Sequence, residues 1–142
     1  MDGPKEVHNY YRHNSWRRVM DAIQVMKEYK VEFNILTVLT EANIKKGREI
    51  YRFFRKNGFS YLQFIPVLEW DTEKQKSRPY AFEPEDYGKF LCQVFDEWIK
   101  QDVGRISVRI FDDLLSYYLG KGAPSCVFKE KCSEYMVVEY NG

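Results

Sequence analysis

The sequence predicts an α/β fold built around a parallel sheet. Short apolar segments rich in β-branched residues alternate along the chain with longer segments whose apolar residues recur at helical spacing. Strands that alternate with helices are joined by crossover connections, which place the strands parallel to one another. The units are too few to close an eight-strand barrel, which leaves part of a (β/α) barrel or an open α/β sheet.

Two helix–strand units are predicted in the first half of the chain. The spacing of apolar residues predicts a helix over residues 15–29, and residues 31–40 are apolar and β-branched, as in a buried strand. A second helix is predicted over residues 43–56. It leads into a second strand over residues 59–68, which Pro66 stops or bends.

The second half continues this alternation after a polar surface loop over residues 69–79. A proline with acidic neighbours marks the start of a helix over residues 83–101. Alternating side chains predict a third strand over residues 105–111, followed by a short helix over residues 112–119. A last strand is predicted over residues 135–140.

The composition is that of a folded domain without a strong electrostatic preference. The 142 residues are 44% apolar, enough to bury one core, and 22 basic residues nearly balance 21 acidic ones. This balance argues against nucleic acid or an anionic membrane as a partner. No apolar run approaches the length of a bilayer span and no signal peptide is visible, so we expect a cytoplasmic protein.

The chain has three cysteines, an odd number that argues against a secreted disulfide framework. Cys92 lies within a helical pattern and is expected to be a small buried side chain. Cys126 and Cys132 lie in a loop rich in Gly, Pro and Lys, in which thiolates can bind a metal. Zinc and iron–sulfur clusters take about four ligands, so either further ligands lie beyond Gly142 or both thiols are free.

Ligands of parallel α/β proteins bind beyond the carboxyl ends of the strands. In this chain those positions are residues 2–4, the surroundings of Thr40, residues 66–68 and Asp112. Arg12 follows the first of them, and its planar guanidinium suits a carboxylate or a phosphate. The alternative is that Arg12 is a solvated surface residue.

Common catalytic motifs are absent from the sequence. No nucleophile elbow accompanies its Ser, His and Asp residues, and neither a P-loop nor a Gly-rich dinucleotide motif occurs. His8 and His13 are too few and too far from other ligands for a zinc site, so neither receives a role.

Five stretches of the chain, taken in order, resemble one family. They are residues 2–9 with Arg12, residues 31–36, residues 61–66, residues 105–115, and the pair Cys126 and Cys132. The ordered set is similar to the region of anaerobic sulfatase-maturating enzymes that begins after the fourth strand of their barrel. The resemblance covers essentially the whole chain.

The resemblance implies the C-terminal part of a partial (β/α) TIM-like barrel over residues 1–122. Residues 123–142 would begin an auxiliary-cluster domain. The chain would then be an internal piece of a longer radical S-adenosylmethionine enzyme that converts a Cys or Ser of a sulfatase polypeptide to Cα-formylglycine. In that family a [4Fe-4S] cluster cleaves S-adenosylmethionine, and the resulting radical abstracts a Cβ hydrogen.

The resemblance also implies roles for individual residues. Arg12 would bind the carboxylate of S-adenosylmethionine, Leu68 would pack near its adenine, and Asn34 would face the same cleft. Cys126 and Cys132 would be the first two ligands of an auxiliary [4Fe-4S] cluster.

The chain also departs from the family. The cluster-binding C-x₃-C-x-x-C and the later cysteines of the auxiliary domain are absent. We therefore expect this piece alone to hold no intact cofactor, to be inactive, and to self-associate through its unpaired strand edge. Three alternatives stay open: a non-enzymatic protein-binding or regulatory domain, a radical enzyme acting on another peptide, and a small zinc-binding α/β protein.

Overall fold

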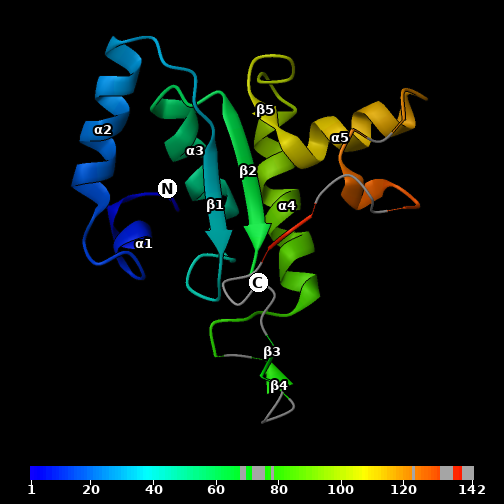
Figure 1. Cartoon of the computed structure of the whole chain (residues 1–142), viewed down its shortest axis with the longest axis horizontal. Helices are drawn as coiled ribbons and strands as arrows, with labels where there is room; N and C mark the ends of the chain where they lie inside the picture. Colours follow the sequence, from blue (N-terminus) through cyan, green and yellow to red (C-terminus); the bar gives the residue numbers. More distant parts are fainter. Residues whose placement is uncertain (68–69, 72–75, 78, 123, 132–135, 139–142) are drawn as a thin grey trace.

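A computed structural model describes residues 1–67, 70–71, 76–77, 79–122, 124–131 and 136–138. Its centre is a parallel sheet in the order β1-β2-β5, with helices on one face (Figure 1). The elements in chain order are α1 (Lys5–Asn9), α2 (Trp16–Glu28), β1 (Ile35–Leu39), α3 (Gly47–Lys56), β2 (Tyr61–Pro66), β3 (Trp70–Asp71), β4 (Lys76–Ser77), α4 (Pro84–Trp98), β5 (Ser107–Val108), α5 (Arg109–Tyr118) and the 3₁₀ turn η1 (Cys126–Phe128).

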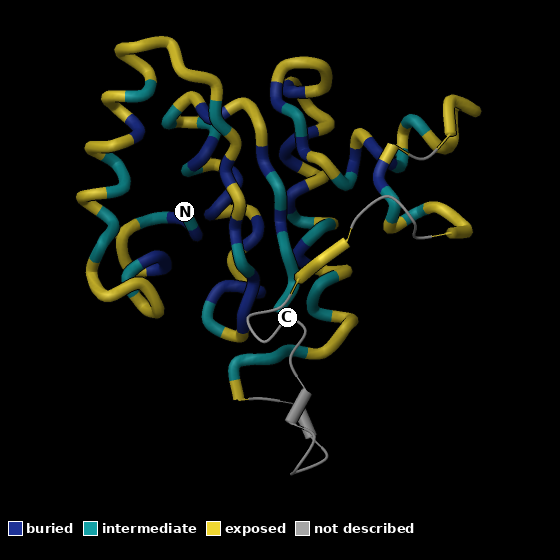
Figure 2. Tube along the Cα trace, viewed as in Figure 1, coloured by how far each residue is buried: buried dark blue, intermediate teal, exposed yellow. Residues whose placement is uncertain are grey.

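The two long strands have one buried and one open face. β1 pairs with β2 in parallel from Ile35 opposite Leu62 to Leu39 opposite Pro66. Burial alternates along these strands (Figure 2). Side chains of a strand alternate between its faces, so Ile35 and Leu62 are buried against the helices while Leu36, on the other face, is exposed. The strand predicted over residues 31–40 as buried is therefore buried on one face only, because helices cover only that face of the sheet (Figure 1).

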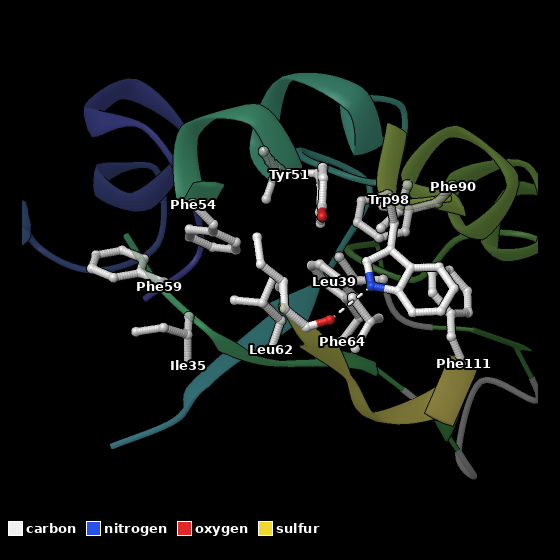
Figure 3. Packing of buried hydrophobic residues seen from close by; sticks show 14 of the residues in the cluster. Ile35, Leu39, Tyr51, Phe54, Phe59, Leu62, Phe64, Phe90, Trp98 and Phe111 are labelled. Atoms are coloured by element: carbon white, nitrogen blue, oxygen red, sulfur yellow. Dashed lines mark hydrogen bonds between the residues drawn. The ribbon is translucent and has the colours of Figure 1, made fainter. Parts of the chain in front are cut away.

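Aromatic side chains fill the space between the sheet and helices α3 and α4 (Figure 3). Phe64 of β2 lies edge to face with Phe90 of α4, with ring centroids 5.0 Å apart. The indole N–H of Trp98 donates a hydrogen bond of 2.7 Å to the Ile106 carbonyl. This contact ties the end of α4 to the residue before β5, so the core also orients the third strand.

Polar contacts connect α3 and α4 at the edges of this core. Arg52 donates two hydrogen bonds to Glu97, at 2.8 Å from Nε and 3.0 Å from Nη2. The Tyr51 hydroxyl donates a hydrogen bond of 2.8 Å to the buried carboxylate of Asp102, in the turn that follows α4. Both helices are thereby held in one orientation behind the sheet.

The prediction of a strand over residues 105–111 is wrong for residues 109–111, which belong to a helix. Only Ser107 and Val108 pair with β2, and α5 begins at Arg109. A run of seven residues can fit both the two-residue period of a strand and the 3.6-residue period of a helix, so packing decides between the two structures. Helical geometry directs Phe111 onto Trp98, with ring centroids 5.3 Å apart. It also brings Asp112 into the first turn, where it accepts a hydrogen bond from Ser107.

Three smaller expectations also need correction. Cys92 is exposed, because Phe90 and Val94 carry the buried face of α4 and a residue two positions from Phe90 points away from it. The loop predicted over residues 69–79 contains the short antiparallel pair of β3 and β4. Of the strand predicted over residues 135–140, only residues 136–138 are described, and they form no strand.

None of the helices in the described ranges is long and apolar enough to cross a membrane.

Candidate functional site

A pocket of about 280 Å³ lies at the carboxyl end of β1 and β2. Its polar lining residues are Asp2, Tyr11, Arg12, Thr40, Asn43 and Tyr80. Its apolar lining consists of three valines: Val7 of α1, Val38 of β1 and Val67 directly after β2. The pocket is therefore at the edge where parallel α/β folds bind ligands, as the sequence predicted.

Arg12 enters this pocket as half of an ion pair with Asp2. Its Nε donates a hydrogen bond of 2.8 Å to Asp2 Oδ2, and its Nη2 lies 3.5 Å from Oδ1. The Asp2 side chain is 7% exposed and that of Arg12 is 45% exposed. Hydrogen bonding to Asp2 raises the pKa of Arg12 further above its ordinary value, so its charge is permanent. Arg12 is thus a half-exposed cation with a buried anchor, unlike an unattached surface residue.

His8 binds the backbone of Asp2 and helps to hold it in place. The Asp2 backbone N–H donates to His8 Nδ1 at 3.3 Å, and His8 Nε2 lies 3.1 Å from Ser15 Oγ. Burial is the main cause that lowers the pKa of His8, against an opposing effect of Asp2. A neutral ring with its proton on Nε2 satisfies both contacts, because Nδ1 is then the acceptor. His8 is therefore an uncharged support for the segment that carries Asp2.

The turn after β1 forms a second wall of the pocket. Asn43 Nδ2 donates a hydrogen bond of 2.9 Å to the Val38 carbonyl, and Asn43 Oδ1 accepts one of 2.9 Å from the Thr40 N–H. The Thr40 hydroxyl accepts a further hydrogen bond of 3.3 Å from Ala42. These bonds take up backbone groups at the strand end, which holds the turn in one shape.

Tyr11 lines the pocket and binds Glu41, which follows Thr40. The Tyr11 hydroxyl donates a short hydrogen bond to Glu41 Oε1, which raises the pKa of Tyr11 to about 12. The phenol is therefore protonated at neutral pH and acts as a hydrogen-bond donor. The Glu41 N–H also donates a hydrogen bond of 3.0 Å to the carbonyl of Tyr80, a pocket residue in the loop before α4.

The predicted site residues are not all in this pocket. Arg12 lines it, while Leu68 and Cys132 lie outside the described residues; Val67, next to Leu68, is part of the wall. Asn34 precedes β1 and lines a separate cavity of about 410 Å³ at the amino ends of the strands. Whether Asn34 faces the same ligand as Arg12 stays a prediction.

Cys126 begins the 3₁₀ turn η1 and is partly buried. Beside it, Ser125 Oγ accepts a hydrogen bond of 3.3 Å from Arg109. No group of three or more metal-ligating side chains gathers within the described ranges. These residues alone therefore do not assemble the ligands of an iron–sulfur cluster.

Sequence reasoning missed Asp2 and His8 as parts of the site. Topology pointed to residues 2–4 as a position of interest, but no spacing motif links Asp2 to Arg12. The link depends on α1 turning the chain back over the end of β1 (Figure 1). An acidic residue before a Gly-Pro turn, followed by an arginine, was the only available signal.

Curated relatives match the chain over its whole length. One is the cysteine-type anaerobic sulfatase-maturating enzyme of Clostridium novyi, 42% identical over 149 residues that span 100% of this chain and 40% of that enzyme. Another is the serine-type anaerobic sulfatase-maturating enzyme of Bacteroides thetaiotaomicron, 33% identical over 161 residues that span 100% of this chain and 39% of that enzyme. No protein-family model matches the chain.

A solved structure agrees with the curated relatives. The enzyme anSMEcpe with bound AdoMet matches with a TM-score of 0.79 and 38% identity, over 89% of this chain and 36% of that one. The chain is homologous, over its whole length, to part of the anaerobic sulfatase-maturating enzymes. This relationship to the sulfatase maturases confirms the family resemblance and the α/β fold with parallel strands. The chain spans about 40% of the length of its curated maturase relatives.

Proposed function

We propose that the chain belongs to a radical S-adenosylmethionine oxidoreductase that converts a sulfatase Cys or Ser to Cα-formylglycine. The observation that carries the proposal is the match of the whole chain to both types of maturase, together with a match to a structure that holds AdoMet. A second structure of anSMEcpe holds AdoMet and the Cp18Cys peptide, which supports a polypeptide substrate for the longer protein.

In this proposal Arg12 binds the carboxylate of S-adenosylmethionine. Its pocket offers a permanent cation at the carboxyl edge of the sheet, and a guanidinium binds a carboxylate through charge-assisted hydrogen bonds. The chemistry that the cofactor supplies when bound is radical removal of a hydrogen atom from the target side chain. The chain's own residues bind and orient the cofactor, and Leu68 next to Val67 would contact the adenine.

The auxiliary cluster is a separate part of the proposal. Cys126 and Cys132 would contribute thiolates, and the remaining ligands would have to come from outside the described residues, because a [4Fe-4S] cluster takes about four. We accordingly divide the chain into barrel residues 1–122 and residues 123–142 of an auxiliary domain. The cytoplasmic location and the self-association of the isolated chain stay predictions.

The test is turnover and binding with the full-length protein under anaerobic conditions. Peptides carrying the target as Cys or as Ser would be incubated with S-adenosylmethionine and a reductant, and formylglycine would be detected by mass spectrometry. Arg12→Gln is expected to weaken S-adenosylmethionine binding strongly. The matched variant Arg18→Gln, at an exposed position of α2, is expected to bind as the wild type does.

Each outcome has a distinct meaning. Formylglycine in one peptide supports the proposal and identifies the target type. Cleavage of S-adenosylmethionine without modification of either peptide would favour a radical enzyme that acts on another peptide. A full-length protein that neither binds iron nor S-adenosylmethionine would contradict the proposal and favour a protein-binding domain.

A further inference from the structure

We infer that Asp2 is a positioning residue, which holds the Arg12 guanidinium so that one of its edges faces a ligand carboxylate in the pocket. The inference rests on the proposed function, because it takes the ligand to be S-adenosylmethionine. It adds a residue whose effect on binding passes through Arg12 and requires no contact with the cofactor.

The geometry of the ion pair separates the two edges of the guanidinium. Asp2 engages Nε at 2.8 Å and Nη2 at 3.5 Å, which is one edge of the planar group. The edge that carries Nη1 is not used by Asp2, and Arg12 borders the pocket. A guanidinium binds carboxylates through paired donors, so the second edge is suited to a second carboxylate.

Asp2 can hold Arg12 in place because it is itself fixed to the sheet. Its Oδ1 accepts a hydrogen bond of 3.2 Å from the backbone N–H of Val38, near the carboxyl end of β1. The residue before it is bound to the same strand, since the Met1 carbonyl accepts a hydrogen bond of 2.9 Å from the Thr37 hydroxyl. The position of Arg12 is thereby tied to the carboxyl half of β1.

His8 leaves the carboxylate to Arg12. With Nδ1 accepting from the Asp2 backbone, the neutral ring donates no proton to the Asp2 carboxylate, although Oδ2 lies only 3.4 Å away. A protonated ring would compete with Arg12 Nε for that same oxygen. The neutral tautomer thus keeps the Asp2–Arg12 bond as the principal charge-assisted contact of this cluster.

Stability alone does not account for the pair. Ion pairs with a half-exposed partner contribute little to folding, and the Arg12 side chain is 45% exposed. An arginine without an anchor would sample many rotamers, and binding would have to order it. The consequence of the pair is therefore an arginine whose orientation exists before the ligand arrives.

The test compares two ligands with the full-length protein. S-adenosylmethionine and its decarboxylated analogue differ in the group that Arg12 would bind, so dissociation constants for both would be measured by calorimetry. Asp2→Asn is expected to weaken binding of S-adenosylmethionine about ten- to hundredfold, as for loss of a charged hydrogen bond, with binding of the analogue unchanged. The exposed Asp21→Asn on α2 is the matched control and should bind both ligands as the wild type does.

Two further variants keep the inference testable if Asp2→Asn folds poorly. Arg12→Lys retains a cation for Asp2 but lacks the second planar edge, so it should lose affinity for S-adenosylmethionine alone. In the Asp2→Asn, Arg12→Gln double variant, the loss of affinity for S-adenosylmethionine should equal that of Arg12→Gln alone. Asp2 acts on binding only through Arg12, so both substitutions remove the same interaction.

Three results would overturn the inference. Equal weakening of both ligands by Asp2→Asn would mean that Asp2 shapes the pocket in general. Additive losses in the double variant would mean that Asp2 acts independently of Arg12. Normal binding of S-adenosylmethionine by Arg12→Gln would contradict the role of Arg12 in binding the ligand carboxylate, while the proposed enzyme function would stand. A wild-type protein that binds neither ligand would contradict both the inference about Asp2 and the proposed function.

Discussion

A methyl group added at Gly47 should separate helices α3 and α4. Gly47 is the first residue of α3, and a Cβ built there would lie 2.7 Å from the Phe90 carbonyl oxygen and 3.1 Å from Gln93 Cβ. The nearer atom belongs to the backbone of α4, so a side-chain rotation cannot relieve the contact. Gly47→Ala therefore requires the two helices to move apart, which would loosen the core between them and the sheet.

The size of the effect follows from two opposing contributions. Overpacking of a buried contact costs about 1–3 kcal/mol. The higher helix propensity of alanine returns at most about 1 kcal/mol. We expect a net loss of about 1–2 kcal/mol in the free energy of unfolding. That corresponds to a decrease in Tm of about 3–8 °C for a chain of this size.

Gly88 provides the matched control within the partner helix. It is exposed in the interior of α4, and a Cβ there would meet nothing within 4 Å. Gly88→Ala should therefore stabilise the protein by about 0.5–1 kcal/mol. Equilibrium urea unfolding followed by circular dichroism measures both variants. A Gly47→Ala protein as stable as the wild type, beside a stabilised Gly88→Ala protein, would refute the close helix contact.

Three further predictions concern charged and polar groups. Hydrogen bonds from Arg52 are the main cause that lowers the pKa of Glu97 to about 2. Wild-type stability should therefore fall as the pH drops from about 4.5 to 2. Urea unfolding midpoints measured against pH should show that the Glu97→Gln variant lacks this loss. Burial lowers the pKa of His8 below 6.5, so its contribution to stability is present above that pH and declines below it; an unchanged decline in His8→Asn would contradict this assignment. Tyr51→Phe removes the hydroxyl that donates the 2.8 Å hydrogen bond to the buried Asp102, and should lower the free energy of unfolding by about 1–3 kcal/mol. Equal urea midpoints for this variant and the wild type would contradict this prediction.

The parts of the fold that local spacing controls were predictable. Helices α2, α3 and α4 and strands β1 and β2 lie within the ranges expected from the sequence, and their parallel pairing follows from the alternation of strands with helices. Their boundaries are narrower than predicted, because flanking apolar residues pack without joining the sheet. Phe59, for example, is buried in the core and lies before β2.

The site was predictable in location but only partly in its members. The rule for parallel sheets led to the edge that holds the pocket, and the type of side chain led to Arg12, which lines it. Leu68 and Cys132 lie outside the described residues, and Asn34 lines another cavity. The roles of Asp2 and His8 depend on contacts with residues in α1, in β1 and in the segment between α1 and α2, which no local pattern encodes.

The sequence by itself determined the order of elements, the parallel sheet and the relationship to the sulfatase maturases, because periodicity and ordered motifs are properties of the chain. Tertiary structure decided that residues after Val108 become a helix, since Phe111 packs on Trp98. It also decided that Asp2, 36 positions from Val38, anchors to β1 and holds Arg12. Such contacts arise only when the folded core brings distant backbone donors and carboxylates within hydrogen-bond range.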